Sequence, residues 1–172
     1  MATREWPDAL FDVLKRAEVA QVGYVPDAGH RRLIERCHAA RGMRTVVLTT
    51  EEEGVALCCG AWLGGQRSVL LMQSSGVGNC INMLGMVAEC RFPLLMLVTM
   101  RGEAGESNPW QVPMGQATAA VLAAMGVVVE RAESAADVAR RAEAAATLAF
   151  VGNRACAVLV AQGVIGFKGF GK

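Results

Sequence analysis

The sequence lacks an excess of charge, long apolar runs and, for the most part, aromatic residues. It has 17 basic and 16 acidic side chains, so its net charge of +1 gives no electrostatic case for nucleic acid or an anionic membrane as a partner. The longest apolar runs, residues 93–98 and 155–161, are too short to span a bilayer. Aromatic residues make up 5% of the chain, whereas 53% is hydrophobic and drawn mainly from Ala, Val, Leu and Met. This composition indicates helices packed on buried strands in one domain, residues 1–172.

Cysteine is present without the spacing that metal sites require. No two cysteines form a C-x-x-C pair, and the chain has only two histidines, which argues against a structural zinc site. Most of the cysteines fall in apolar stretches, where a free thiol acts as a small hydrophobe. Because residues 1–6 also show no signal-peptide core, reduced thiols in a cytoplasmic protein are expected. The six are Cys37, Cys58, Cys59, Cys80, Cys90 and Cys156.

Hydrophobic periodicity alternates between strand and helix along the chain. It predicts an α/β fold with a single doubly wound parallel sheet of six strands and helices on both faces. The expected strands are 19–25, 45–49, 67–73, 94–99, 126–130 and 154–160. The expected helices are 6–17, 31–41, 51–63, 80–90, 115–125 and 134–150, the last with Ser134 and Asp137 as a capping box. Residues 163–172, Gly-rich and apolar, have no covering helix and are expected to pack on a partner subunit.

Polar residues gather where the expected strands end. Four segments, 26–30, 50–53, 74–79 and 101–113, follow strands and so meet at the carboxyl edge of the sheet, where open α/β sheets bind ligands. Glu51, Glu52 and Glu53 stand at the start of a helix, and acidic residues there are also favoured by the helix dipole alone. The pattern by itself favours this structural interpretation of the three carboxylates.

Other motifs at this edge are weak when taken singly. Gly76-x-Gly78 lacks the third glycine of a dinucleotide fingerprint, because Ile81 stands in its place. A backbone that comes close to some ligand is the better explanation of these glycines. Ser74 and Ser75 lie outside a nucleophile elbow and are typical of polar residues that cap a helix. His30 is typical of a surface loop, and Arg101 suits an anionic group. Glu103 and Glu106 are expected to be solvated.

Taken together, these segments resemble the pyrimidine-binding (PYR) domain of thiamine diphosphate enzymes. Glu51 followed by Gly60 matches the glutamate and glycine, nine residues apart, that open this domain. The similarity is to sulfopyruvate decarboxylase α subunits and phosphonopyruvate decarboxylases. It extends in family order over about residues 5–161, with matching pieces at 25–27, 51–54, 60–65, 71–79, 101–103 and 112–115.

The resemblance implies a role for each residue at the edge of the sheet. Glu51 would activate the aminopyrimidine of the cofactor to form the C2 ylid, the electron sink for loss of CO₂ from a 2-oxo acid. Asp27 and His30 would lie near the reactive carbon and the substrate, and Arg101 near the charged end of the substrate. The residues lining the pyrimidine side would be Gln73, Ser74, Ser75, Gly76 and Asn79.

The resemblance also implies an incomplete site. The family holds Mg²⁺ and the diphosphate through a Gly-Asp-Gly motif, and this sequence contains none. A β subunit carrying the diphosphate-binding (PP) domain is therefore expected, with the cofactor at the interface of a hetero-oligomer and no metal ligand in this chain.

Two departures from the family leave the reaction open. Ser74 stands where relatives have Asn, and Gln111 where they have His, so the identity of the 2-oxo acid is not fixed. Carboligation or C–C cleavage also remain alternatives to decarboxylation. A non-catalytic assembly subunit is a further alternative, but Glu51 speaks against it because a decayed site would lose that residue first. An unrelated nucleotide-binding domain is disfavoured by the incomplete glycine motif.

Overall fold

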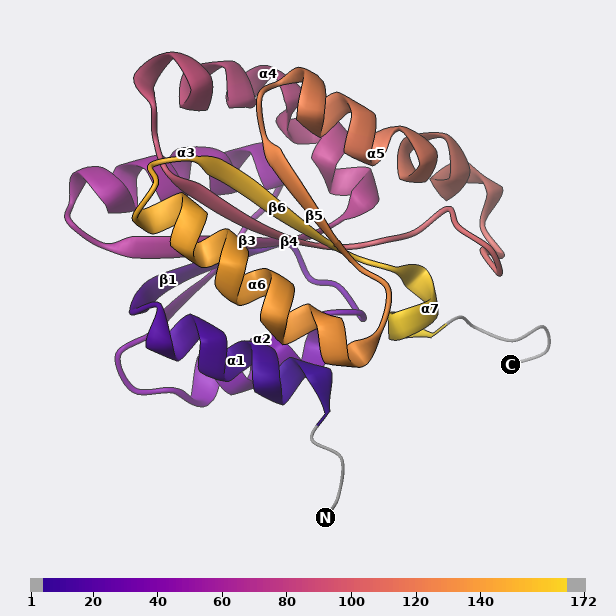
Figure 1. Cartoon of the computed structure of the whole chain (residues 1–172), viewed down its shortest axis with the longest axis horizontal. Coiled ribbons are helices and arrows are strands. Elements are labelled where there is room, and N and C mark those ends of the chain that lie inside the picture. Colours follow the sequence, from indigo (N-terminus) through magenta and orange to yellow (C-terminus); the bar gives the residue numbers. More distant parts are fainter. Residues whose placement is uncertain (1–4, 167–172) are drawn as a thin grey trace.

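The computed structural model describes residues 5–166 and has the expected parallel sheet at its centre (Figure 1). All strand pairs in it are parallel, and the strand order is β2-β1-β3-β4-β6-β5. The prediction of a six-stranded parallel sheet is confirmed. The strands are β1 Val19–Tyr24, β2 Arg44–Val47, β3 Arg67–Gln73, β4 Leu94–Thr99, β5 Val128–Ala132 and β6 Ala155–Val160.

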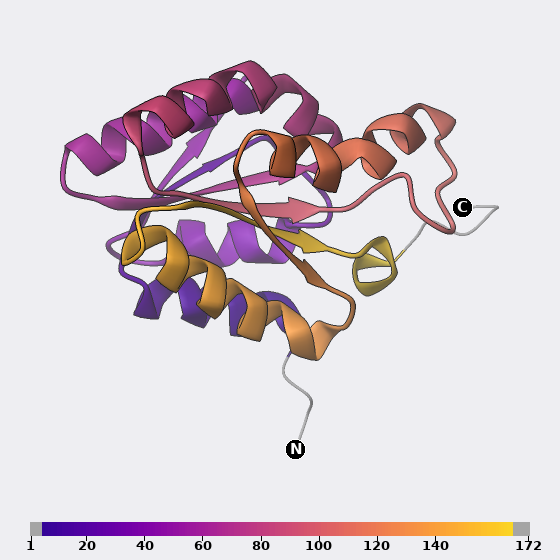
Figure 2. The ribbon, with the colours of Figure 1, turned by 45° about the horizontal axis from the view of Figure 1, so that its top comes forward.

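Helices cover both faces of the sheet, as Figures 1 and 2 show. One layer is formed by α1 (Trp6–Arg16), α2 (Arg31–Ala39) and α6 (Ala135–Phe150). The other is formed by α3 (Glu51–Leu63), α4 (Ser74–Cys90) and α5 (Val112–Ala124). A short helix η1 (Pro109–Gln111) precedes α5, and α7 (Gln162–Ile165) follows β6. None of the helices within residues 5–166 is long and apolar enough to cross a membrane.

The central strands are buried on both faces. Side chains of β3 alternate, so that Val69 and Leu71 join the layer of α1 and α6, while Leu70 and Met72 join the layer of α3 and α4. All six residues of β4 are buried as well. This double burial explains the continuous apolar runs of the two strands, because each is covered by helices above and below.

Several predicted boundaries are wrong. The segment 74–79, expected as a loop, forms the first turns of α4 despite its glycines, because packing against α3 overrides the low helix propensity of glycine. Helix α5 begins at Val112, since Pro113 is compatible with the first turn. Ser134 makes no bond to the backbone of α6 and instead contacts the Asp137 carboxylate at 3.1 Å, so the capping box is incomplete.

The end of the described chain also differs from expectation. Residues 162–165 form α7, which is tied to the loop after β4 through Gln162. The expectation of an uncovered segment is therefore wrong for residues 163–165, because Val164 and Ile165 pack against the core of this chain. Residues 167–172, on which most of that prediction falls, lie outside the described residues, so packing on a partner stays a prediction.

Candidate active site

The candidate site lies at the carboxyl edge of the sheet, near the boundary between β1 and β3. The chain leaves β1 toward β2 on one side and continues from β3 to β4 on the other, which makes this boundary the switch point of the topology. The segments that meet here are residues 25–30, residues 100–111 and the first turns of α3 and α4.

Glu51 is the first residue of α3, and its charged side chain is largely buried. It is 8% exposed, and its Oε2 accepts a hydrogen bond of 2.8 Å from Asn79 Nδ2 on α4. In the described part of the chain no hydrogen bond reaches Oε1. One carboxylate oxygen is therefore fixed within the chain while the other is available to a ligand.

Gly76 creates the space that the Glu51 side chain occupies. A Cβ at position 76 would lie 2.5 Å from Glu51 Cγ and closer still to the carboxylate carbon and Oε1. Any other residue would displace the carboxylate, because real side chains do not approach this closely. The close contact at Gly76 is with Glu51 of the same chain, and the predicted approach of this backbone to a ligand stays a prediction.

The neighbouring carboxylates keep the structural interpretation. Glu52 and Glu53 are exposed. Glu53 accepts hydrogen bonds from the Thr49 hydroxyl at 2.7 Å and the Thr49 backbone N–H at 2.9 Å, and these bonds lower the pKa of Glu53. Glu53 thus stabilises the start of α3, and the structure distinguishes its role from that of Glu51.

Asp27 joins the ends of three adjacent strands, β1, β3 and β4. Its Oδ1 accepts hydrogen bonds from Gln73 Nε2 at 2.8 Å and from the Gly29 backbone at 3.1 Å. Its Oδ2 accepts one of 2.5 Å from the Thr99 hydroxyl. The structure therefore brings together the predicted residues Asp27 and Gln73 and adds Thr99 to them.

His30 is not the surface histidine that its place in a loop suggested, because it is 0% exposed. Its place near the reactive carbon and the substrate stays a prediction. Its Nε2 contacts the Leu97 carbonyl oxygen at 3.0 Å, beneath the sheet edge. Burial lowers the pKa of His30, with the Asp27 carboxylate opposing that effect. The described chain thus presents His30 as a neutral internal side chain beside Asp27.

Ser74 is also internal, and its place along the pyrimidine side stays a prediction. It is fully buried, and its hydroxyl oxygen accepts a hydrogen bond of 3.0 Å from the Arg101 backbone N–H. Its side chain does not cap the N-terminus of α4, contrary to the prediction that Ser74 and Ser75 act as helix-capping residues. Ser74 therefore anchors the loop after β4, while Ser75 is half-buried on the first turn of α4.

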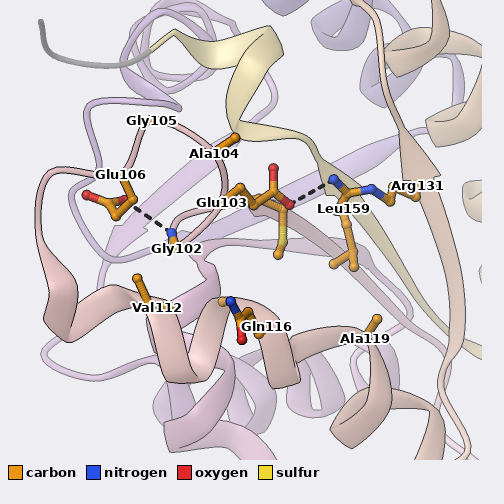
Figure 3. A pocket seen from close by; sticks show the side chains of 12 residues that line it. Gly102, Glu103, Ala104, Gly105, Glu106, Val112, Gln116, Ala119, Arg131 and Leu159 are labelled. Atoms are coloured by element: carbon orange, nitrogen blue, oxygen red, sulfur yellow. Dashed lines mark hydrogen bonds and ion pairs between the residues drawn. The ribbon is translucent and has the colours of Figure 1, made fainter.

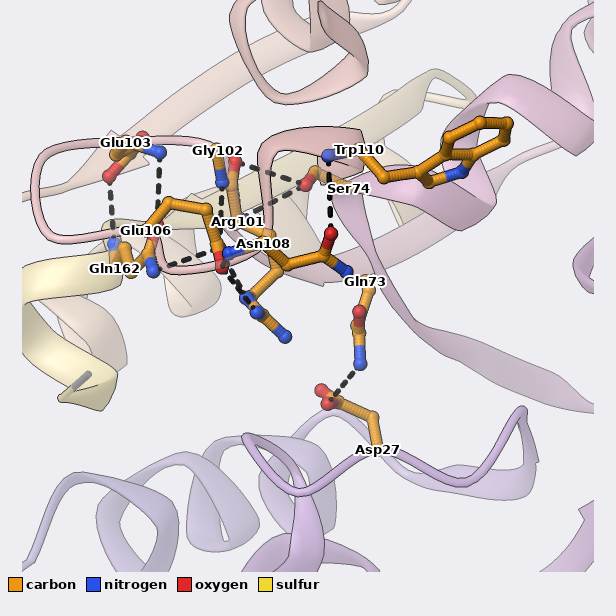
Figure 4. Close-up of polar contacts among 10 residues, drawn as sticks. All are labelled: Asp27, Gln73, Ser74, Arg101, Gly102, Glu103, Glu106, Asn108, Trp110 and Gln162. Atoms are coloured by element: carbon orange, nitrogen blue, oxygen red, sulfur yellow. Dashed lines mark hydrogen bonds and ion pairs between the residues drawn. The ribbon is translucent and has the colours of Figure 1, made fainter. Parts of the chain in front are cut away.

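Arg101 lies at this edge as predicted, but it already has an acidic partner. Its Nε and Nη2 donate to Glu106 at 2.7 and 2.6 Å (Figure 4). The prediction that Glu106 is solvated is wrong, because its side chain is 2% exposed. Glu103 is also engaged, since it pairs with Arg131 at 2.8 Å and is 22% exposed. These ion pairs order the loop between β4 and η1.

Two pockets flank this loop. The first, of about 470 Å³, is lined by Asp27, Gln73, Thr99 and Arg101 together with residues of the loop and α7. The second, of about 510 Å³, lies between the loop, α5 and β6, and the Glu103–Arg131 pair crosses it (Figure 3). The first pocket collects Asp27, Gln73 and Arg101, and we name it the substrate-side pocket after the role that the resemblance implies for Asp27 and Arg101.

Sequence reasoning missed Thr99, Glu106 and Gln162. Thr99 carried a usable signal, since a polar residue ends a fully apolar strand at the edge where the other candidates meet. The other two carried none. Gln162 contacts Glu103 and Glu106 from 59 and 56 residues away, a pairing that only the folded chain reveals.

Within residues 5–166 no group of three His, Cys, Asp or Glu side chains is arranged to hold a metal ion. The carboxylates of Asp27, Glu51 and Glu106 instead each accept a hydrogen bond from an amide, hydroxyl or guanidinium group of the chain.

Comparison with known proteins assigns the chain to a protein family. The model of the family described as "Thiamine pyrophosphate enzyme, N-terminal TPP binding domain" matches residues 4–120. The α subunit of sulfopyruvate decarboxylase from Methanococcus maripaludis is 35% identical over 116 residues, which are 67% of this chain and 70% of the relative. Phosphonopyruvate decarboxylase from Streptomyces hygroscopicus is 35% identical over 102 residues, 58% of this chain and 25% of the relative.

The fold agrees with that assignment. A solved 2-oxoglutarate:ferredoxin oxidoreductase from Magnetococcus marinus superposes with a TM-score of 0.73 over 95% of this chain at 16% sequence identity, and this chain spans 30% of that protein. The chain therefore belongs to the thiamine pyrophosphate enzymes, as their N-terminal TPP-binding domain, and is related to the α subunits of sulfopyruvate decarboxylase.

Proposed function

We propose that this chain is the α, pyrimidine-binding subunit of a heteromeric thiamine diphosphate-dependent 2-oxo acid decarboxylase of the sulfopyruvate decarboxylase kind. The observation that carries the proposal is the Glu51 carboxylate, buried against Gly76 and held by Asn79 at 2.8 Å. Family membership and the similarity to sulfopyruvate decarboxylase α subunits support the same function.

The residues around Glu51 fit the aminopyrimidine of the cofactor. Asn79 occupies Oε2, so Oε1 is the atom through which Glu51 would share a proton with the ring. The glycine cradle at position 76 fixes the carboxylate, and burial keeps that proton from being lost to water. When bound, thiamine diphosphate supplies the electron sink for loss of CO₂ from a 2-oxo acid.

The substrate-side pocket fits a small 2-oxo acid. Arg101 supplies guanidinium donors that suit a carboxylate or another oxyanion. Asp27 holds the Gln73 amide and the Thr99 hydroxyl and thereby orders one wall of the pocket. We assign Ser75, Gly76 and Asn79, at the start of α4, to the cofactor side. Gln73, at the end of β3, lines the pocket, and we assign it to the boundary between the pocket and the cofactor side.

A second chain would complete the site. We assign Mg²⁺ and the diphosphate to a β subunit with a PP domain, because this sequence has no Gly-Asp-Gly motif. Trp110 is 85% exposed on η1 beside the site, and Leu63 is 75% exposed on α3. Large exposed apolar side chains of this kind favour contact with a partner. The six free cysteines support a cytoplasmic location for the assembly.

A matched pair of variants on α3 tests the proposal. The chain is co-expressed with its genomic neighbour, and CO₂ release from sulfopyruvate, phosphonopyruvate and pyruvate is followed with thiamine diphosphate and Mg²⁺. Glu51→Gln is expected to lower kcat by about 100-fold or more, the usual range for loss of a proton-transfer group. Glu52→Gln, an exposed neighbour on the same helical turn, is expected to retain activity.

The outcomes separate the alternatives. Equal rates for Glu51→Gln and the parent would refute the mechanism. Consumption of a 2-oxo acid into a coupled product would favour a carboligase, and no turnover with any substrate would favour an assembly subunit. Calorimetry adds an independent test: tight, Mg²⁺-dependent binding of the cofactor to the isolated chain would contradict the half-site.

A further inference from the structure

Glu106 is the most heavily hydrogen-bonded side chain at the edge of the site. Its carboxylate accepts five hydrogen bonds, of which two come from Arg101 and two from the backbone N–H groups of Gly102 and Asn108, at 3.1 and 2.9 Å. The fifth comes from Gln162 Nε2 at 3.1 Å. The Glu106 side chain is 2% exposed, so its negatively charged carboxylate is buried within the loop after β4.

The pair with Arg101 is bidentate and fixes the orientation of the guanidinium. The bonds of 2.7 and 2.6 Å join Nε and Nη2 of Arg101 to Oε2 and Oε1 of Glu106. These bonds hold the pKa of Glu106 well below its usual range, so the pair stays charged. A guanidinium has five N–H donors, and this geometry uses two of them.

The remaining donors of Arg101 belong to the substrate-side pocket. Arg101 lines that pocket together with Asp27 and Gln73, and Figure 4 shows its guanidinium on the side of the loop that faces these two residues. Among the described residues that line the pocket, Arg101 is the one cation, and Asp27 and Glu106 are the anions. The residues that line the pocket therefore carry no net positive charge. Arg101 would recognise an acidic group mainly through the direction of its free N–H donors.

We propose that Glu106 is a positioning residue that selects the substrate by aiming Arg101. It occupies the Nε and Nη2 edge of the guanidinium and leaves the Nη1 edge for the acidic group at the end of the 2-oxo acid opposite its 2-oxo carboxylate. The selection of substrate rests on the function proposed above, whereas the aiming of Arg101 does not.

Glu103 provides a matched control on the same loop. It also contacts Gln162, through the Gln162 backbone N–H at 2.8 Å, and it also pairs with an arginine, Arg131. Its side chain lines the neighbouring pocket and is absent from the lining of the substrate-side pocket (Figure 3). A general loss of loop order would thus affect Glu103→Gln and Glu106→Gln alike.

A double-mutant cycle in the assembled holoenzyme separates positioning from loop anchoring, with sulfopyruvate as the probe. Glu106→Gln is expected to raise KM about tenfold or more with kcat changed much less, since a bond between charged groups is replaced by a neutral one. In an Arg101→Ala background the same change is expected to leave KM unaltered. Glu103→Gln is expected to leave KM near that of the parent. An equal rise in KM in the Arg101→Ala background, or no rise at all, would overturn the proposal.

Nuclear magnetic resonance of the ¹⁵N-labelled full chain tests the aiming of Arg101 without any activity. The Arg101 Nε–H signal, assigned by its loss in Arg101→Lys, is expected to be protected from exchange with water in the parent and in Glu103→Gln. It is expected to lose that protection in Glu106→Gln. A rapidly exchanging signal in the unaltered chain would overturn the proposal without relying on any Glu106 variant. Absence of turnover by the wild-type holoenzyme would overturn the proposed function and the selection of substrate, and the Nε–H signal would still decide the aiming.

Discussion

Gly76→Ala is the sharpest perturbation that the structure offers, because it displaces the Glu51 carboxylate without removing any ionisable group. The added Cβ would lie 2.5 Å from Glu51 Cγ, so the carboxylate has to leave its place between α3 and α4. Overpacking of this kind costs about 1 to 3 kcal/mol. Replacing a helical glycine by alanine returns about 1 kcal/mol. The free energy of unfolding is therefore expected to fall by about 0 to 2 kcal/mol, which leaves the chain folded.

Activity should respond far more strongly than stability. Under the proposed function, a displaced Glu51 cannot share a proton with the aminopyrimidine. The kcat of the assembled holoenzyme is therefore expected to fall by about 100-fold, as with removal of the carboxylate. Urea unfolding gives the stability of each variant, and initial rates of CO₂ release give kcat.

Gly85→Ala is the control for the substitution itself. Gly85 lies on the same helix, and a Cβ there would meet nothing within 4 Å in the described chain. This variant is expected to unfold at a similar or slightly higher urea concentration and to keep Glu51 in place. Wild-type turnover by Gly76→Ala would refute the reasoning, because Glu51 could then be displaced at no cost to the reaction.

Two further predictions concern groups that the fold buries. Burial lowers the pKa of His30 in the folded chain. As pH falls through about 6.5, the ordinary pKa of histidine, His30 therefore takes up a proton in the unfolded chain and not in the folded one. The free energy of unfolding should drop there by at most about 1.4 kcal/mol per pH unit. Urea titrations at pH 7.5 and 5.5 measure this loss, which should be absent in His30→Gln, and an equal loss in that variant would exclude His30 as the cause. Burial also raises the pKa of Cys58 and Cys80 to about 12, while Cys90 is exposed. Iodoacetamide should therefore alkylate Cys90 first in the native chain, as read by mass spectrometry, and early labelling of Cys58 or Cys80 would contradict the packing of α3 and α4.

The elements that sequence patterns predicted best are those with the strongest local signals. The bounds of α3 and β3, residues 51–63 and 67–73, agree with the structure at both ends. The predicted start of α4 was wrong because the glycines of residues 74–79 locally favour a loop. In the folded chain these residues are helical, and their small size lets them pack against α3 and the Glu51 side chain. The positions of Glu51 and Asp27 at one edge followed from the carboxyl-end rule, because both residues directly follow strands or turns.

The sequence by itself determined the parallel sheet, the layer of helices on each face and the family, since all three depend on periodicity and on motifs spaced along the chain. Only the tertiary structure decided which polar groups meet. It buried His30 and Ser74, placed Glu51 against Gly76, and paired Arg101 with Glu106. The physical reason is that burial and hydrogen bonding depend on neighbours from distant segments, as Gln162 and Glu106 show from 56 residues apart. A charge pattern alone cannot distinguish a solvated carboxylate from one that accepts five hydrogen bonds.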